Sequence, residues 1–292
     1  MPGIPHADVT IDANIVRSLM ATSPWPASED PSFWARGFDN EIWCVGHRAV
    51  HLPRRHEAVG ALRNEQRWLN EVTRSLPVQT PAVLFAGEPT AQYPYPWSVT
   101  HFVNGRTGFD SPLKVRAASA ATLGAALRAL HRAAPPDAPR NPLRGVALDR
   151  RSENLQTRLT AVDSQTAEIV MPHFDRGLTA QPFTDQPVWI HGDIHPGNLI
   201  YDNQELVGLV DFSDLACGDP AVDLGGALFS LPVVAHGSFW QSYGNEDEGL
   251  RLRALGWTAL LAILHLQIEI AEHTVLACEA LAWLARLTSP QV

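Results

Sequence analysis

Acidic and amide side chains follow two apolar segments near the middle of the chain. The first segment, Val188–Ile190, is followed closely by Asp193 and then by Asn198 five residues later, and the second, Leu206–Val210, runs directly into Asp211. Strand ends that deliver oxygen atoms to one place suit a hard cation, since Mg²⁺ is commonly held by one or two carboxylates together with substrate phosphates. The spacing therefore predicts a magnesium site that includes Asn198 and Asp211.

The order of these groups matches what phosphoryl transfer requires. That reaction needs metal ions to neutralise the phosphates and a group that orients the attacking hydroxyl. In a protein-kinase catalytic loop, the orienting aspartate follows a histidine by two positions and precedes a metal-binding asparagine. His191, Asp193 and Asn198 have this arrangement. A turn at Asn203 would place Asn198 and Asp211 across a hairpin. We therefore expect His191 and Asp193 to be catalytic.

The same stretch resembles a known enzyme family. HGDIHPGNLIYDN and GLVDFSDLACGDPAVDLGG are similar to the core of the aminoglycoside phosphotransferases, a branch of the protein-kinase-like fold, and the resemblance extends from about Phe33 to Trp257. It implies an α+β, two-lobed structure. Residues 1–105 would form a small β-rich nucleotide-binding lobe with the hinge at its end, and residues 106–292 a larger, mostly helical lobe. In the GDPxxDL segment, Asp219 and Asp223 would support the catalytic loop.

The resemblance also implies an activity. The chain would be a small-molecule kinase that uses Mg²⁺ and transfers the γ-phosphate of ATP or GTP to a hydroxyl of an aminoglycoside-type antibiotic. A macrolide phosphotransferase, which needs a larger apolar opening, and a metabolic kinase acting on an amino alcohol or a sugar stay open. A non-catalytic nucleotide-binding protein on the same fold is the alternative of another class. The presence together of Asp193, Asn198 and Asp211 argues against it.

The nucleotide-binding residues are expected in the N-terminal part. Residues 33–55 are rich in β-branched and aromatic residues interrupted by glycine, which predicts strands. By resemblance, one turn covers the phosphates, one small residue faces the base, one helix glutamate pairs with the phosphate anchor, and the hinge backbone meets the base. The phosphate-covering turn would contain Gly37 and Asn40, and Ala49 would face the base. Glu65 would be the helix glutamate, and the hinge backbone would be that of Phe102 and Val103.

His51 is the main departure from the kinase pattern. Kinases place a lysine two residues after the alanine, on the same face of the strand, and this chain has His51 there. An imidazole is shorter and largely neutral at neutral pH unless its pKa is raised. Three outcomes stay open: His51 is a weaker phosphate anchor, Arg54 or Arg55 reaches the phosphates instead, or nucleotide binding is impaired.

The negative charge is concentrated in the last third of the chain. The net charge is −9, and from Trp189 onward there are thirteen acidic and three basic residues. Nucleic-acid binding requires a basic surface, so we exclude that partner. An acidic cleft favours a cationic small molecule. The candidates to meet substrate amines are Glu246, Asp247, Glu248, Glu269 and Glu272, with Glu279 nearby on the same predicted helical region.

Composition and the N-terminal sequence indicate the cellular compartment. Cys44, Cys217 and Cys278 are widely spaced, which is typical of reduced thiols in the cytoplasm. The N-terminus lacks the basic and apolar regions of a secretory signal, and no apolar run approaches about 20 residues. We expect a cytoplasmic protein without a membrane partner, either a monomer or a homodimer.

Helical periodicity places the remaining elements. Apolar spacing predicts a helix within residues 8–22, with Asp12 as its N-cap. Residues 56–76, 113–134 and 152–169 are expected to be helical, whereas 171–187 is expected to be a looser connection. The mostly apolar residues 250–287 are interpreted as two helices.

Overall fold

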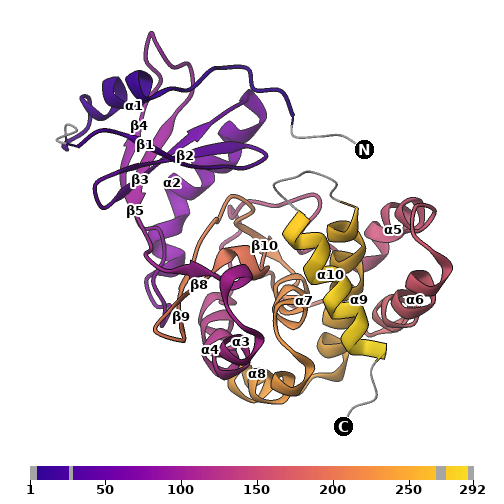
Figure 1. Cartoon of the computed structure of the whole chain (residues 1–292). Coiled ribbons are helices and arrows are strands. Elements are labelled where there is room, and N and C mark those ends of the chain that lie inside the picture. The colour runs from indigo at the N-terminus through magenta and orange to yellow at the C-terminus, as the bar shows by residue number, and fades with distance from the viewer. Residues whose placement is uncertain (1–4, 26–28, 268–273, 289–292) are drawn as a thin grey trace.

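An antiparallel sheet forms the N-terminal part of the protein (Figure 1). The structure is a computed structural model that describes residues 5–25, 29–267 and 274–288. In spatial order the five strands are β1 (Ser32–Arg36), β2 (Asn40–Val45), β3 (Arg48–Pro53), β5 (Trp97–His101) and β4 (Val83–Gly87). Every neighbouring pair is antiparallel. Burial alternates along β2, as expected when one face of a sheet is covered.

The helix α1 (Ala13–Met20) packs on this sheet. Its N-cap is Asp12, whose Oδ1 accepts hydrogen bonds from the backbone N–H groups of Asn14 and Ile15 at 2.8 and 2.9 Å. Val16, Leu19 and Met20 are buried in a core with residues of the sheet. The predicted helix and its cap are confirmed.

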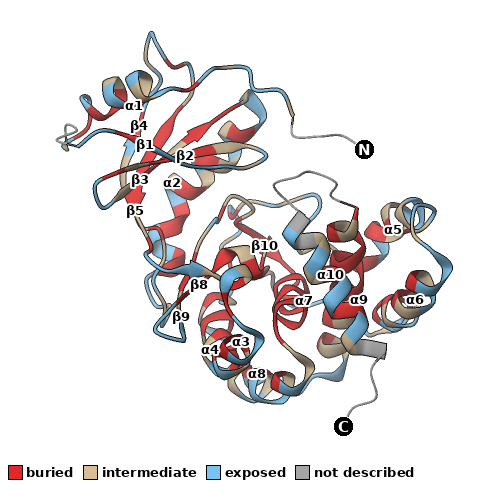
Figure 2. Cartoon of the chain, in the orientation of Figure 1, coloured by how far each residue is buried: buried red, intermediate tan, exposed pale blue. Residues whose placement is uncertain are grey.

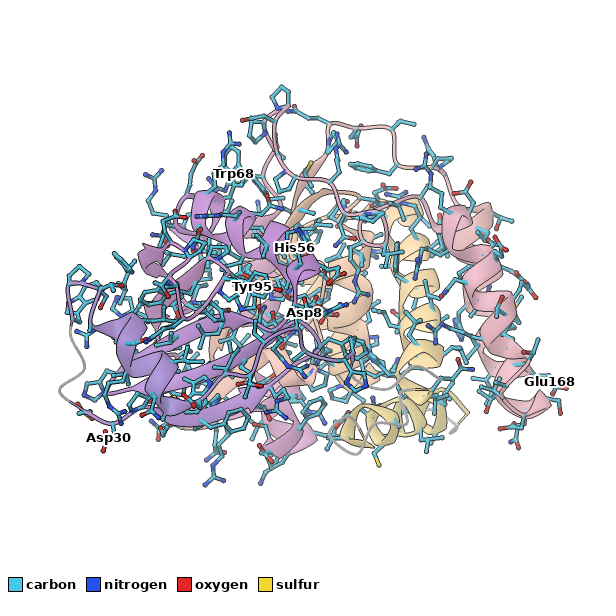
Figure 3. The ribbon with its side chains drawn as sticks, turned by 90° about the horizontal axis from the view of Figure 1, so that it is seen from above. Asp8, Asp30, His56, Trp68, Tyr95 and Glu168 are labelled. Atoms are coloured by element: carbon cyan, nitrogen blue, oxygen red, sulfur yellow. The ribbon has the colours of Figure 1, made fainter. Side chains whose placement is uncertain are left out.

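The helix α2 (Val59–Thr73) connects the sheet to the rest of the protein and follows a short 3₁₀ turn, η1 (His56–Ala58). At its beginning, Asp8 Oδ2 accepts hydrogen bonds from the His56 N–H at 2.8 Å and the Tyr95 hydroxyl at 2.9 Å (Figure 3). At its other end, Trp68, Leu69 and Val72 belong to the core of the helical part. One helix therefore contributes to both halves of the molecule.

The C-terminal end of α2 is fixed to the helical part. Arg132 Nη2 donates hydrogen bonds to the backbone oxygens of Val72 and Glu71 at 2.8 and 3.3 Å. These carbonyls lie at a helix end, where they lack partners within the helix. The rings of Trp68 and Trp189 lie 5.2 Å apart. The last turn of α2 is thus held by both a hydrogen-bonded cap and aromatic packing.

The helical part begins after a short connection, because β5 ends at His101 and β6 begins at Arg106. Its helices are α3 (Leu113–Ala118), α4 (Ala120–Leu130), α5 (Ser152–Leu159), α6 (Ser164–Thr179), α7 (Ala221–Ser230), α8 (His236–Tyr243), α9 (Glu248–Leu266) and α10 (Thr274–Thr288). Its strands are β6 (Arg106–Thr107), β7 (Val188–Ile190), β8 (Leu199–Asp202), β9 (Glu205–Leu209) and β10 (Ala216–Gly218). The short 3₁₀ turns are η2 (Gly108–Asp110), η3 (Leu148–Arg151), η4 (Pro196–Asn198) and η5 (Val233–Ala235).

The helices α7 and α9 form the buried centre of this part (Figure 2). Of the described helices, α9 is the one that is long and apolar enough to cross a bilayer, but 67% of its most apolar window is buried inside the protein. Its apolar side chains therefore serve as core. The β-rich N-terminal part and the larger helical part together confirm the predicted two-lobed α+β fold.

Three helical predictions need correction. The expected helix over residues 113–134 is broken at Ser119, whose hydroxyl accepts a hydrogen bond from the Leu206 N–H at 3.0 Å, and it ends at Leu130. The expected helix over residues 152–169 is interrupted, because α5 ends at Leu159 and α6 begins at Ser164 with Asp163 as its N-cap. The expected connection over 171–187 is helical up to Thr179, with Pro172 inside α6. Proline removes one helical hydrogen bond, and packing of Gly177 against Gly256 of α9, with no room for a side chain between them, holds α6 in place.

Candidate active site

A braced loop presents Asp193. The loop follows β7, which pairs with β10 in an antiparallel manner. The Asp223 carboxylate accepts hydrogen bonds from the N–H groups of His191 and Gly192 at 2.7 and 2.8 Å, and Gly192 has a φ of 87°. His131 in turn contacts Asp223 at 3.1 Å. The buried carboxylate therefore fixes the backbone directly before Asp193.

His191 supports the loop from below. The ring is fully buried, its Nδ1 accepts a hydrogen bond from the Asp193 N–H at 3.2 Å, and its Nε2 lies 3.0 Å from the backbone oxygen of Val210. Because Nδ1 accepts, the proton is assigned to Nε2, which donates to Val210. A buried ring with both nitrogens engaged cannot contact a substrate. His191, expected among the catalytic residues, instead joins the Asp193 loop to the strand end at Asp211.

Asn198 and Asp211 lie on neighbouring strand ends, as the hairpin predicted. The Val210 N–H donates to the Asn198 backbone oxygen at 3.0 Å. The Asn198 side-chain Nδ2 donates a hydrogen bond to the backbone oxygen of Asp193 at 2.9 Å. The amide oxygen Oδ1 is then the side-chain atom that can bind a metal ion. Asp211 has a φ of 61°, a left-handed conformation that costs energy for a residue other than glycine. The backbone thus holds the Asp211 carboxylate in an unusual direction.

This donor set fits Mg²⁺. Among the residues that the structure describes, no group of three or more His, Cys, Asp or Glu side chains forms a metal cluster. Mg²⁺ does not require one, because it retains water and is usually bound by one or two carboxylates plus phosphates. The Asn198 amide oxygen and the Asp211 carboxylate supply two hard oxygen ligands beside Asp193.

The Asp193 carboxylate lies between two basic side chains. Arg144 Nη2 donates to Oδ1 at 2.9 Å, and His195 Nε2 lies 3.5 Å from Oδ2. Burial raises the pKa of Asp193, but the Arg144 charge and the His195 contact outweigh burial and hold this pKa well below its usual value. The carboxylate is therefore ionised at every physiological pH.

Arg144 is a site residue that the sequence analysis missed. Its Nε donates to Asp214 Oδ2 at 3.0 Å, so the guanidinium bridges Asp193 and Asp214. The Arg144 loop is tied to β10 by hydrogen bonds from the Cys217 N–H to the Pro139 oxygen and from the Asp219 N–H to the Gly145 oxygen. Arg144 lies in a Pro-rich loop without periodicity, and only its three-dimensional contacts reveal it.

His195, which lies beside Asp193, belongs to a cluster of aromatic and histidine rings. Phe109 stacks on His195 with ring centroids 5.9 Å apart, and His265 of α9 lies 5.9 Å from His195. Phe229 packs on His265 at 5.1 Å. These rings come from four separate segments, so the sequence alone could not bring them together.

The turn expected to cover the phosphates joins β1 to β2. The Gly37 N–H donates to the Asn40 oxygen at 2.9 Å. The buried Arg54 donates to the Gly37 oxygen at 3.1 Å, and Arg55 Nε donates to Asp39 Oδ1 at 2.8 Å. Both arginines are thus engaged with the turn itself.

His51 and Glu65 face Asp211 from the sheet side. Burial lowers the pKa of His51 to about 4, with Asp211 acting in the opposite direction. Burial and then Asp211 raise the pKa of Glu65 to about 8. Between these values both groups are neutral, and within the described residues the Glu65 carboxylate has no ion-pair partner. The pair expected by resemblance is therefore not formed, and His51 is not an imidazolium at neutral pH.

The other predicted base-contacting residues lie on the same side. Ala49 of β3 is buried and pairs with Thr100 of β5. Phe102 follows β5, and its ring meets the half-exposed Trp34 edge-on at 4.9 Å. Val103 is buried next to it. The structure thus brings these residues to the point where the sheet joins the helical part.

The acidic candidates at the start of α9, Glu246, Asp247 and Glu248, are separated from Asp193. Asp247, between Glu246 and Glu248, is the N-cap of α9, whereas His265 of the Asp193 surroundings is in its last turn. A rise of 1.5 Å per residue puts about 25 Å between the two ends. Glu279 is bound bidentately by Arg116. Glu269 and Glu272 lie outside the described residues.

Asp219 has a supporting position. Its carboxylate accepts a hydrogen bond from Arg253 Nε at 2.8 Å and from the Ala221 N–H at 3.0 Å. Burial raises the pKa of Asp219 and Arg253 opposes this. The contacts join the residues after β10 to α9, and so they support the segment from outside the Asp193 loop.

Comparisons with known proteins agree with this architecture. A model of the phosphotransferase enzyme family (APH) matches residues 32–261, and the search of curated protein sequences gave no match. The solved structure of APH(2")-IIia with GDP and kanamycin is 19% identical, with a TM-score of 0.71 over 94% of this chain and 98% of that one. Macrolide 2'-phosphotransferase MphH from Brachybacterium faecium is 17% identical, with a TM-score of 0.59 over 96% and 99%.

At these identities the structural likenesses establish the fold. The family model covers most of the chain, including the Asp193 loop, the metal-ligand candidates and the bracing Asp223. The chain therefore belongs to the phosphotransferase enzyme family and has the kinase-like fold of the aminoglycoside phosphotransferases.

Proposed function

We propose that the protein transfers the γ-phosphate of ATP or GTP to a hydroxyl group of an aminoglycoside-type antibiotic. The observation that carries this proposal is the ionised Asp193 carboxylate, held by a braced loop beside the oxygen donors of Asn198 and Asp211. A hydroxyl-orienting group next to two hard metal ligands is the arrangement that phosphoryl transfer requires. Solved relatives contain GDP, ADP or ATP, which supports a nucleotide as the donor.

In the proposed reaction, Asp193 accepts a hydrogen bond from the acceptor hydroxyl and aligns its oxygen with the terminal phosphorus. The bond between that phosphorus and the bridging oxygen breaks as the new P–O bond forms, the hydroxyl proton passes to Asp193, and the nucleoside diphosphate leaves. Mg²⁺, bound by Asn198 Oδ1 and Asp211, would neutralise the phosphate charge. A low pKa makes Asp193 a weak base, which a loose transition state tolerates because positioning dominates.

The aminoglycoside class rests on the fold relatives, which include complexes with kanamycin, gentamicin and streptomycin. The cationic nature of such drugs suits the acidic C-terminal third of the chain. Glu269 and Glu272 stay candidates for the amines.

A macrolide is the second candidate acceptor. Phe109 and His195 are partly exposed and stack on each other near Asp193, and such a ring surface suits an acceptor with an apolar face. The fold relative MphH is named as a macrolide 2'-phosphotransferase. The two candidates differ in charge, so they are separated by direct comparison.

The test is release of nucleoside diphosphate with Mg²⁺ and either ATP or GTP, against aminoglycosides, macrolides and small amino alcohols. We expect release that depends on one class of acceptor. Asp193→Asn should abolish transfer and keep nucleotide binding, whereas Asp202→Asn, an exposed carboxylate on the hairpin, should leave turnover unchanged. Substantial turnover in Asp193→Asn would remove Asp193 from the reaction. No release with any acceptor by the folded wild-type protein would reject the proposed function.

A further inference from the structure

The transferred phosphoryl group needs a positive charge that the expected N-terminal residues do not provide. In kinases a lysine on the third strand contacts the phosphates. Here burial keeps His51 neutral, Arg54 donates to the Gly37 backbone oxygen, and Arg55 is paired with Asp39. All three side chains are thus engaged elsewhere or uncharged.

We propose that Arg144 is a catalytic residue that contacts the transferring phosphoryl group and at the same time holds Asp193. The proposal rests on the proposed function, and it adds a residue from a loop that lies outside the Asp193 motif. It is carried by the 2.9 Å contact between Arg144 Nη2 and Asp193 Oδ1. Arg144 is the arginine that pairs with this carboxylate, and His195 Nε2 lies 3.5 Å from its other oxygen.

The location follows from the geometry of the reaction. The acceptor hydroxyl must be hydrogen-bonded to Asp193, and its oxygen must lie about 3–3.5 Å from the phosphorus in a reactive complex. A guanidinium in contact with the same carboxylate is therefore within reach of the phosphoryl oxygens. Lysine residues that serve kinases come from the sheet, whereas Arg144 comes from a loop of the helical part.

Arg144 also has N–H groups that are available to bind a phosphoryl oxygen. A guanidinium carries five N–H donors in a fixed plane, and the structure uses Nε for Asp214 and Nη2 for Asp193. Within the described residues, Nη1 donates to no protein atom. The side chain keeps 20% of its surface exposed, so the group is not sealed inside the protein. Arginine suits this task because its planar fork can bind two carboxylates and a phosphoryl oxygen together.

Hydrogen bonds and close backbone packing fix the loop that carries Arg144. Asn141 Oδ1 accepts hydrogen bonds from the N–H groups of Leu143 and Arg144 at 2.8 and 3.1 Å, and its Nδ2 donates to Asp214 Oδ1 at 2.8 Å. Gly145 has a φ of 62°, and a Cβ on the facing Gly218 would lie 2.2 Å from its oxygen. Such close backbone packing restricts the loop to one position relative to β10.

During transfer, Arg144 would neither gain nor lose a proton. Negative charge spreads over the equatorial oxygens as the terminal phosphorus leaves the bridging oxygen and bonds to the acceptor oxygen. The guanidinium would stabilise this charge more strongly in the transition state than in the bound nucleotide. The expected signature is therefore a loss of transition-state binding without a matching loss of nucleotide binding.

Calorimetry can detect that signature without knowledge of the acceptor. The nucleoside diphosphate is titrated with Mg²⁺ alone, and then with Mg²⁺ and aluminium fluoride, which mimics the transferring phosphoryl group. We expect the wild-type protein to bind the mimic more tightly than the diphosphate. Arg144→Gln should bind the diphosphate within about threefold of wild type and lose about 100-fold for the mimic, as for removal of one oxyanion donor.

Two further variants complete the design. Arg144→Lys keeps the charge but not the fork and should lose less than Arg144→Gln, and it serves in place of Arg144→Gln if that protein does not fold. Arg140→Gln removes an exposed arginine from the same loop and should behave as wild type.

The outcomes separate the two proposals. Equal binding of the mimic by wild type and both Arg144 variants would overturn the role of Arg144. Wild-type binding of the diphosphate without any tightening by aluminium fluoride would also overturn it, with nucleotide binding intact. Failure of the folded wild-type protein to bind any nucleotide would instead reject the proposed function, and the Arg144 proposal with it.

Discussion

Replacement of Glu65 by glutamine is the sharpest test of the electrostatics around Asp211. The carboxyl group is 4% exposed, and burial, followed by the Asp211 charge, raises its pKa from 4.5 to about 8. At neutral pH the group is therefore protonated in the folded protein and ionised in the unfolded chain. Glutamine has nearly the same shape and cannot ionise.

The sign and size of the effect follow from proton linkage. Between pH 4.5 and about 8 the folded protein retains a proton that the unfolded chain releases, so the free energy of unfolding must fall as the pH rises through this window. At 1.36 kcal/mol for each pH unit, the loss approaches about 5 kcal/mol above pH 8 and about 3 kcal/mol at pH 7. Glu65→Gln should lack this loss, so the variant should be the more stable protein at high pH.

Urea unfolding of the nucleotide-free protein from pH 5 to 9 measures this difference. The gap between Glu65→Gln and wild type should widen with pH and level off above pH 8. Glu71→Gln, an exposed change on the same helix, should follow the wild-type curve. If Glu65→Gln and wild type give parallel curves throughout, then Glu65 is ionised in the folded protein and the reasoning is refuted.

Three other predictions concern the surroundings of Asp193 and the nucleotide. Because burial lowers the pKa of His51 to about 4, the KM for nucleotide should show no His51 titration from pH 5.5 to 8.5; a limb that disappears in His51→Gln would contradict this. A Cβ at Gly226 would lie 2.1 Å from the backbone oxygen of Ile194, next to Asp193, so Gly226→Ala should lower kcat by at least about tenfold. The control is Gly60→Ala, which has nothing within 4 Å and should stabilise α2 by up to about 1 kcal/mol. Equal kcat values for the two variants would exclude the clash. Asp223→Asn has only one side-chain oxygen to accept hydrogen bonds where two N–H groups now donate. The variant should lose about 1–3 kcal/mol of unfolding free energy, measured by thermal unfolding, and should have a lower kcat, measured by diphosphate release. An unchanged kcat would show that the loop does not depend on this carboxylate.

The sequence predicts the elements whose chemistry is local. Asp193, Asn198 and Asp211 are separated by fixed short distances along the chain, and their residue types alone limit the reaction they can perform. The Asp12 cap and α1 are equally local, because a cap bonds to N–H groups two and three residues away. Such features require no knowledge of the remainder of the fold.

Other features depend on contacts between distant segments. Arg144 meets Asp193 across a separation of 49 residues, and no pattern marks its loop. At the break between α3 and α4, the Ser119 hydroxyl accepts a hydrogen bond from a strand N–H 87 residues away. The helix through Pro172 depends on packing against α9, which outweighs the local preference of proline. The burial that neutralises His51 and Glu65 is likewise a property of the assembled protein.

The fixed end of α2 contrasts with the mobile helix of regulated protein kinases. In regulated protein kinases the corresponding helix moves so that its glutamate pairs with the phosphate lysine only in the active state. Here Arg132 caps the last turn and Trp68 packs against Trp189, so contacts with the helical lobe fix the C-terminal end of the helix. Displacement of α2 from the helical lobe would therefore break both the Arg132 cap and the packing of Trp68 on Trp189.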